Sequence, residues 1–206
     1  MPRCRSLPVW LLPLALCLTA LAQPHPAALL LPAQLDTAGQ IDVDGRSTPY
    51  LIRRLPVTSY PELPAGLQRA LIERGCLVPQ TYEAHRPENV IHASLERAGS
   101  DDWALLCSVA GRVSLLVSFG GSPENLVSLI SFPETSRLQP HLGPGPLGFN
   151  WGLDPASPAQ VHQAQAGLSP RPSAVDHDAL ADSTIERKTI YRYYVRNVWT
   201  RLEMPQ

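Results

Sequence analysis

Proline most constrains the fold of this chain, because it occupies 22 of the 206 positions. This is about twice the usual frequency of roughly 5%. Proline lacks a backbone N–H donor and interrupts both helices and central strands. The chain is therefore expected to contain many loops and few long helices. Its 44% of hydrophobic residues is enough to fill the core of a single domain.

The charge composition argues against two kinds of protein. Charged residues make up only 17% of the chain, and the formal net charge is −1. A disordered polyelectrolyte is excluded by these values. The same balance gives no indication of a nucleic-acid partner or of an anionic membrane surface as partner.

Residues 1–22 have the three parts of a secretory signal peptide. Two arginines precede an apolar stretch from Leu7 to Leu18, and Ala20-Leu21-Ala22 fits a cleavage site before Gln23. A retained membrane anchor is the main alternative, although a span needs about 20 continuous apolar residues and this stretch is shorter. We expect a secreted or periplasmic protein, cleaved after Ala22, with no membrane span after cleavage.

Cleavage would remove two of the four cysteines and leave Cys76 and Cys107. An oxidising compartment favours a disulfide between them, and only one intramolecular pairing is possible. A buried pair of free thiols is the alternative. Two cysteines alone cannot complete a structural zinc site.

The fold class indicated by the pattern is α+β. Residues 23–39 are expected to form a Pro/Ala-rich N-terminal arm, and residues 40–206 a single α+β domain. The Asp44-Gly45 dipeptide follows an alternating run and indicates a tight hairpin turn. Residues 63–75 carry an apolar stripe at helical spacing and end in Gly75, which is typical of a helix C-terminus.

An antiparallel β-meander is expected to pack against this main helix. Residues 102–109 and 113–119 alternate around a turn, with further strands expected over 88–95 and 125–132. We expect one buried face, formed by Trp103, Leu105, Cys107 and Val109 together with Val113, Leu115, Val117 and Phe119.

The second half of the chain is expected to begin with a long Pro/Gly-rich loop over residues 139–158. Two short helices are then expected, over 159–166 and 175–183. Strands are expected over 188–195 and 198–202, where tyrosine and β-branched residues are frequent.

Familiar catalytic signatures are absent from the sequence. It contains no Gly-x-Ser-x-Gly, Gly-x-Gly-x-x-Gly, phosphate-binding loop or His-Glu-x-x-His. We therefore assign no catalytic residue and expect no cofactor.

Two groups of residues are candidate sites. Asp176, Asp178 and Asp182, with His177 among them, could bind a cation or act as an acid/base pair. The alternative is structural, with Asp176 capping a short helix. Phe149, Asn150, Trp151 and Asp154 are candidate ligand contacts, because a large apolar residue on a loop is not readily explained by a core.

Three stretches resemble a group of secreted bacterial proteins of unassigned function. They are Arg-Gly-Cys-x-x-Pro-Gln at 74–80, Asp-Trp-Ala-x-Leu-Cys-Ser at 102–108 and Asp-His-Asp-x-x-x-Asp at 176–182. The resemblance covers roughly residues 60–202 and implies a shared small extracytoplasmic domain. It implies no activity, substrate or catalytic residue.

Two functions remain open from the sequence. The first is an exported, non-catalytic envelope or extracellular protein that binds a partner protein, a glycan or a small ligand. The alternative is a small hydrolase that uses Asp176, His177 and Asp178, with or without a metal.

Overall fold

Strands dominate the part of the chain that the structure describes. The computed structural model describes residues 35–141 and 145–203, so the expected signal peptide and residues 23–34 of the expected arm lie outside it. The described residues form mainly β-strands with two α-helices, and the first strand already begins at Thr37. The expected α+β class, one meander against one main helix, is therefore wrong.

The first sheet has nine strands in the order β7-β6-β5-β3-β2-β9-β8, with β1 beside β2 and β4 beside β5. It is mixed, because β2 and β9 run parallel while the other pairs are antiparallel. The strands expected over 88–95 and 125–132 are confirmed as β4 and β7. The bounds are β1 Thr37–Val43, β2 Arg46–Pro56, β3 Leu77–Gln80, β4 Val90–Ala93, β5 Asp102–Val109, β6 Arg112–Ser118, β7 Leu126–Pro133, β8 Leu138–Gln139 and β9 Leu147–Phe149.

The second sheet is antiparallel and has the order β10-β11-β12-β13. Its strands are β10 Trp151–Ala156, β11 Ala179–Thr184, β12 Lys188–Val195 and β13 Val198–Glu203. The last two confirm the strands expected over 188–195 and 198–202. The loop expected over 139–158 is wrong, because this region contains β9 and β10. Since β10 is an edge strand, it accommodates Pro155 without losing an interior hydrogen bond.

The helix expected over 175–183 is also wrong, because β11 lies there. Alanine and leucine favour helices locally, but here successive side chains point to opposite faces of a strand. Leu180 packs between the two sheets, whereas Ala179 and Ala181 pack on the opposite face of the second sheet. Burial on both faces therefore outweighs local helix propensity.

The two α-helices are α2 (Ala65–Glu73) and α3 (Pro158–Gln165), which confirms the helices expected over 63–75 and 159–166. Gly75 has a φ of 71°. Its N–H donates to Ile72 O and that of Cys76 to Leu71 O, at 2.9 and 3.0 Å. These two bonds form a Schellman motif. Short 3-10 turns occupy Val57–Ser59, Phe119–Gly121, Pro123–Asn125 and Glu134–Arg137.

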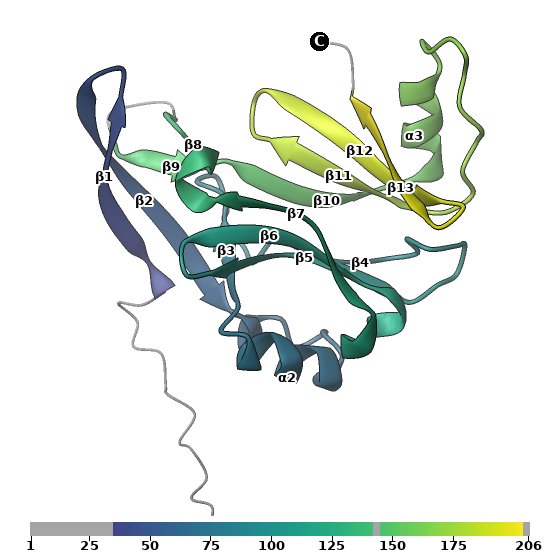
Figure 1. Cartoon of the computed structure of the whole chain (residues 1–206), viewed down its shortest axis with the longest axis horizontal. Coiled ribbons are helices and arrows are strands. Elements are labelled where there is room, and N and C mark those ends of the chain that lie inside the picture. Colours follow the sequence, from purple (N-terminus) through teal and green to yellow (C-terminus); the bar gives the residue numbers. More distant parts are fainter. Residues whose placement is uncertain (1–34, 142–144, 204–206) are drawn as a thin grey trace, which may run out of the picture.

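The elements stack in four layers: α2, the first sheet, the second sheet and α3. Figure 1 shows α2 and the second sheet on opposite sides of β5, β6 and β7. One apolar cluster lies between the sheets and includes Leu106, Leu115 and Trp151. A second includes Leu67 and Leu71 of α2, and a third lies between the second sheet and α3.

The register of the β5–β6 hairpin determines which residues share a face of the first sheet. Both faces are buried, each in a different apolar cluster. Ala110 and Gly111 have φ values of 49° and 76°, as in a two-residue type I′ turn, and Val109 pairs with Arg112. Leu106 therefore pairs with Leu115, and Leu105 with Leu116. The expected single face is wrong, because a one-residue difference in register moves every side chain to the other face.

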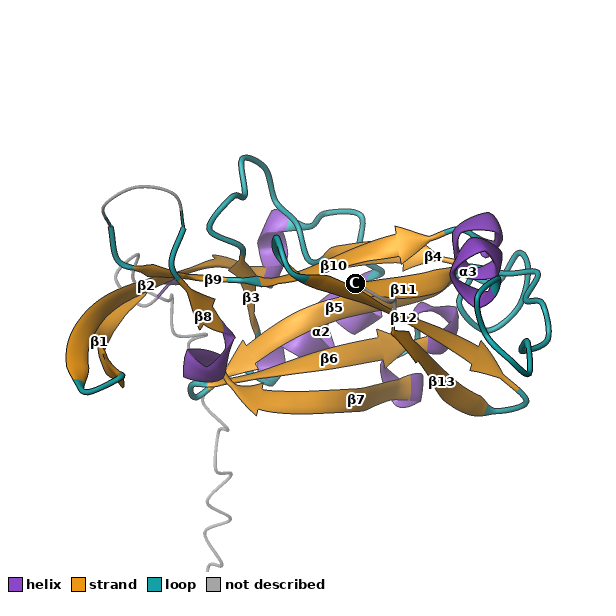
Figure 2. Ribbon diagram, turned by 90° about the horizontal axis from the view of Figure 1, so that it is seen from above, coloured by secondary structure: helices purple, strands orange, loops and turns teal. Residues whose placement is uncertain are grey.

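Two further hairpins use the same turn geometry. Asp44 and Gly45 have φ values of 53° and 76°, which confirms the turn expected there, and Arg196 and Asn197 have φ values of 52° and 64°. The β1–β2 hairpin extends from one end of the molecule, away from α3 (Figure 2).

Candidate functional site

Cys76 and Cys107 form a disulfide, as expected, with their Cα atoms 5.3 Å apart. Cys76 is the last residue of the Schellman motif that ends α2, and Cys107 lies in β5. The disulfide therefore joins the end of the helix to the centre of the first sheet. Both cysteines are buried.

The candidate ligand contacts Phe149, Asn150 and Trp151 are buried, and Trp151 has no exposed surface. The indole Nε1 of Trp151 donates to Asp182 Oδ1 at 2.6 Å. Arg192 donates to the other carboxylate oxygen of Asp182 at 2.7 Å. Two candidate residues, Trp151 and Asp182, thus meet in the interior, where they form a charge-assisted network with Arg192 across β10, β11 and β12 of the second sheet.

The acidic candidate residues Asp176, Asp178 and Asp182 have different hydrogen-bond partners and do not converge on one site. The carboxylate of Asp178 accepts from Ser94 N at 3.1 Å, and Asp178 N donates to Ser94 O at 2.9 Å. Asp182 is buried and paired with Arg192. Among the described residues, no group of three or more His, Cys, Asp and Glu is placed to hold a metal ion.

Asp176 does not cap a helix, because a bend rather than a helix begins there. Its side chain is 89% exposed and lies 3.1 Å from Nδ1 of His177. This hydrogen bond holds the pKa of Asp176 below its usual value. The other ring nitrogen of His177 lies 2.8 Å from the carbonyl oxygen of Tyr194. A carbonyl oxygen only accepts, so Nε2 is the donor in this contact.

The outer face of the second sheet is covered at one end by α3 and is open at the other. Ala156 and Ala181 pack with Val161 of α3. The open part forms a groove of about 560 Å³. We call it the outer groove, and it is lined by Glu83, Asp154, Tyr191 and residues 183–189, which include Arg187 and Lys188.

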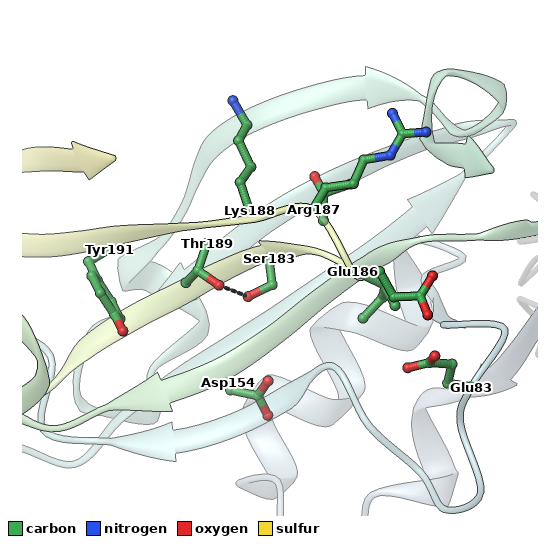
Figure 3. Close-up of a pocket in the computed structure, with 10 residues that line it drawn as sticks. Glu83, Asp154, Ser183, Glu186, Arg187, Lys188, Thr189 and Tyr191 are labelled. Atoms are coloured by element: carbon green, nitrogen blue, oxygen red, sulfur yellow. Dashed lines mark hydrogen bonds between the residues drawn. The ribbon is translucent and has the colours of Figure 1, made fainter. Parts of the chain in front are cut away.

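The register of the second sheet places the polar side chains of the outer groove on one face. Asp154 pairs with Ala181, which pairs with Tyr191, while Ser183 pairs with Thr189. Directly opposed residues in antiparallel strands project to the same side. Figure 3 shows Tyr191, Thr189 and Ser183 along the two strands, with Asp154 nearby.

The groove offers hydrogen-bonding groups and one aromatic ring. Ser183 Oγ lies 3.0 Å from Thr189 Oγ1, so the two hydroxyls bond to each other. Tyr191 is half-buried, and Asp154 is exposed. No histidine is among the described residues that line the groove, and the hydroxyl of Ser183 bonds to that of Thr189.

The pKa of Asp154 in the groove is raised above its usual value. Although the residue is exposed, nearby protein atoms partly desolvate its carboxylate and so raise its pKa, and the negative charge of Glu88 acts in the same direction. Arg86 opposes both effects. The carboxylate is therefore incompletely compensated in the unliganded protein, which leaves it able to accept hydrogen bonds from a ligand.

A chain of hydrogen bonds supports the rim of the groove from below. Asn150 donates to Gln139 at 3.0 Å, Gln139 to the hydroxyl of Tyr82 at 2.8 Å, and Tyr82 to Glu186 at 3.3 Å. Asn150, a candidate ligand contact, thus acts beneath the groove and does not line it.

Of the candidate ligand residues, only Asp154 lines the groove. Ser183 was missed because residues 175–183 were interpreted as a helix. Thr189 and Tyr191 lie in the strand expected over 188–195, to which no ligand-binding role was assigned. The sequence did contain a signal for the two strands that carry these three residues. Side-chain types alternate on both sides of the short segment 185–187, which is typical of a hairpin.

Within the described residues, no helix is long and apolar enough to cross a membrane. The chain matches no protein-family model, no curated protein and no solved structure.

Proposed function

We propose that this is an exported, non-catalytic binding protein whose outer groove takes a glycan. The observation that carries the proposal is the ring of Tyr191 on the same sheet face as the hydroxyls of Ser183 and Thr189 and the carboxylate of Asp154. An open groove with few aromatic groups and several polar ones is suited to a hydroxylated ligand.

The chemistry of a sugar matches these groups. A pyranose ring presents C–H bonds on its faces, which can pack on the exposed part of the Tyr191 ring. Its hydroxyls lie around the edge, where a carboxylate and two protein hydroxyls can accept and donate hydrogen bonds. A hydrogen bond to a charged group contributes about 1.5–3 kcal/mol. Asp154 is therefore the strongest single contact in the proposal.

Export is supported by two independent features. Residues 1–22 have the composition of a signal peptide, with Ala20-Leu21-Ala22 before Gln23. The disulfide is typical of proteins outside the reducing cytoplasm. We propose a periplasmic or extracellular location, with a glycan of the cell envelope or its surroundings as the ligand.

Export is tested by the intact mass of the protein recovered from outside the cytoplasm. The expected chain begins at Gln23. A soluble exported protein that retains residues 1–22 would contradict the proposed cleavage.

Glycan binding is tested on an oligosaccharide array, with Asp154→Asn and Asp44→Asn as matched variants. Both replace one exposed carboxylate by an amide, but Asp44 lies in the turn of the distant β1–β2 hairpin. We expect Asp154→Asn to weaken binding about tenfold or more and Asp44→Asn to leave it unchanged. A blank array, or equal binding by both variants and the wild type, would contradict the proposal.

A further inference from the structure

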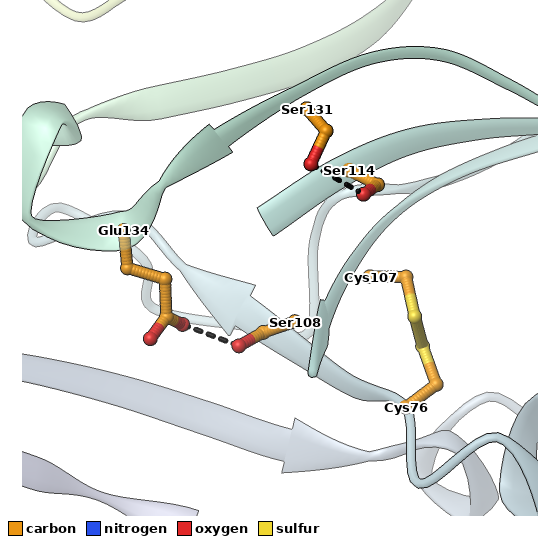
Figure 4. Close-up of a disulfide and its surroundings, with 6 residues drawn as sticks. All are labelled: Cys76, Cys107, Ser108, Ser114, Ser131 and Glu134. Atoms are coloured by element: carbon orange, nitrogen blue, oxygen red, sulfur yellow. Dashed lines mark hydrogen bonds between the residues drawn. A yellow bond between two sulfur atoms is a disulfide. The ribbon is translucent and has the colours of Figure 1, made fainter. Parts of the chain in front are cut away.

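The face of the first sheet that carries α2 is not covered over its whole length. The helix ends at Glu73, and beyond it Cys107, Ser114 and Ser131 form a row across β5, β6 and β7. Figure 4 shows this row beside the disulfide. Here the surface encloses a hollow of about 260 Å³, which we call the helix-end hollow.

Two arginines line the helix-end hollow. Arg74 is the C-cap residue of α2, and Arg112 begins β6. Both are anchored through the backbone: Arg74 precedes the Schellman glycine and the disulfide, and Arg112 follows the type I′ turn. The two cations are therefore presented by rigid elements.

Within the described part of the chain, no acidic side chain compensates the two arginines of the hollow. Neither Arg74 nor Arg112 forms an ion pair with any described residue. No acidic side chain is among the described residues that line the hollow. Among the described residues, the side chain of Arg112 bonds only to Ser131, at the long distances of 3.4 and 3.5 Å.

The floor of the hollow supplies further donors. Ser114 Oγ donates to Ser131 Oγ at 3.0 Å. The proton of the Ser131 hydroxyl is then free to point toward a ligand. Two guanidinium groups and a hydroxyl donor around a small hollow form a set of groups that is complementary to an oxyanion.

We propose that the helix-end hollow binds a small oxyanionic group between Arg74 and Arg112. The group is a sulfate, a phosphate or a carboxylate, either free or as a substituent of a larger ligand. This site lies on the α2 side of the first sheet, whereas the outer groove lies on the far side of the second sheet. The proposal is independent of glycan binding.

The test is a calorimetric titration of the disulfide-bonded protein with inorganic sulfate, inorganic phosphate and acetate, each at constant ionic strength against chloride. Arg112→Gln removes one proposed contact. Arg69→Gln is the matched control, because Arg69 is exposed on α2 and does not line the hollow. We expect saturable binding of at least one oxyanion by the wild type, weakened about tenfold by Arg112→Gln and less than twofold by Arg69→Gln.

The relative affinities of the three anions identify the chemical class of the group that binds. Tighter binding of sulfate or phosphate indicates an ester group of that kind, and tighter binding of acetate indicates a carboxylate. No saturable binding of any anion would overturn the proposal. Equal weakening by Arg112→Gln and Arg69→Gln would also overturn it, since that result reflects general charge screening.

Discussion

Trp151 illustrates how a residue's role depends on contacts far along the chain. Its indole bonds to Asp182, and the guanidinium of Arg137 lies 4.4 Å from the centre of its ring. The same guanidinium lies 4.3 Å from the ring of Phe132. Burial lowers the pKa of Arg137, and the nearby charge of Asp182 opposes that shift. Trp151 therefore organises a buried network between the sheets.

We predict that Trp151→Ala lowers the free energy of unfolding by about 3–5 kcal/mol, the usual cost of removing a buried aromatic side chain. Urea denaturation of the two proteins measures the difference. Trp199→Ala should cost less, because Trp199 is only partly buried. A loss below about 1 kcal/mol for Trp151→Ala would place this side chain outside the core.

Asp154 gives a prediction with a defined pH dependence. Because partial desolvation of its carboxylate raises its pKa in the folded protein, protonation stabilises the fold. That stability is present below the unfolded-state pKa and is lost as the pH rises through the folded-state pKa. Asp154→Asn should therefore be more stable than the wild type at pH 7 and equal to it at pH 3. Thermal unfolding of both proteins at pH 7 and pH 3 measures the difference in stability. A variant that is less stable than the wild type at pH 7 would contradict the prediction.

At the residue scale, local signals could be predicted and long-range partners could not. Gly75, Asp44 and Gly45 adopt conformations that their own side chains favour, so their roles follow from short sequence patterns. Cys76 and Cys107 had only each other as partners once the signal peptide was set aside. The bond between Trp151 and Asp182 spans 31 residues and depends on the register of β10 and β11.

At the element scale, the helices and hairpins were predicted better than the strands with distant partners. α2 has an apolar stripe and a glycine stop, and α3 has a capping box between Ser157 and Gln160. β9 has three residues and pairs in parallel with β2 about a hundred positions earlier. No local periodicity can reveal such a strand.

Close packing at β9 leads to a prediction about two glycines. A Cβ atom on Gly148 would lie 2.4 Å from Cβ of Tyr82, whereas the nearest neighbour of one on Gly66 lies at 3.8 Å. Gly148→Ala should therefore destabilise the protein by about 1–3 kcal/mol through overpacking. Gly66→Ala, in α2, should stabilise it by roughly 0.5 kcal/mol. Denaturant midpoints measure both, and equal effects would contradict the packing described here.

The disulfide connects two elements and is expected to stabilise the protein strongly. It closes a segment with a sequence separation of 31. The chain-entropy model assigns about 3–4 kcal/mol to such a link. The double variant Cys76→Ser/Cys107→Ser should lower the melting temperature by roughly 10 °C. An unchanged melting temperature would show that the link constrains the unfolded chain little.

At the scale of the whole molecule, the fold class was missed because both faces of the first sheet are buried. The pattern of β5 and β6 was interpreted as one apolar face, but Leu105 and Leu106 pack in different clusters. Asn89 shows how the two sheets are joined. Its side chain donates to Pro79 O in β3 and accepts from Leu153 N in β10, both at 2.8 Å.

The outer groove likewise forms only where elements that are distant in the sequence pack together. Glu83 precedes β4, Asp154 lies in β10, and Ser183 and Tyr191 come from β11 and β12. Only the stacking of these elements brings their side chains to one place. Sequence reasoning identified Asp154 as a candidate and could not place it beside the others.

The most direct test of glycan binding in the outer groove is a backbone amide chemical-shift map. The isotope-labelled protein is titrated with the oligosaccharide that gives the strongest array signal. We predict shift changes concentrated at Gly152, Asp154 and residues 183–191, with little change in β1 or α2. Saturable changes confined to other parts of the surface, with residues 183–191 unaffected, would contradict the assignment of the ligand to this groove.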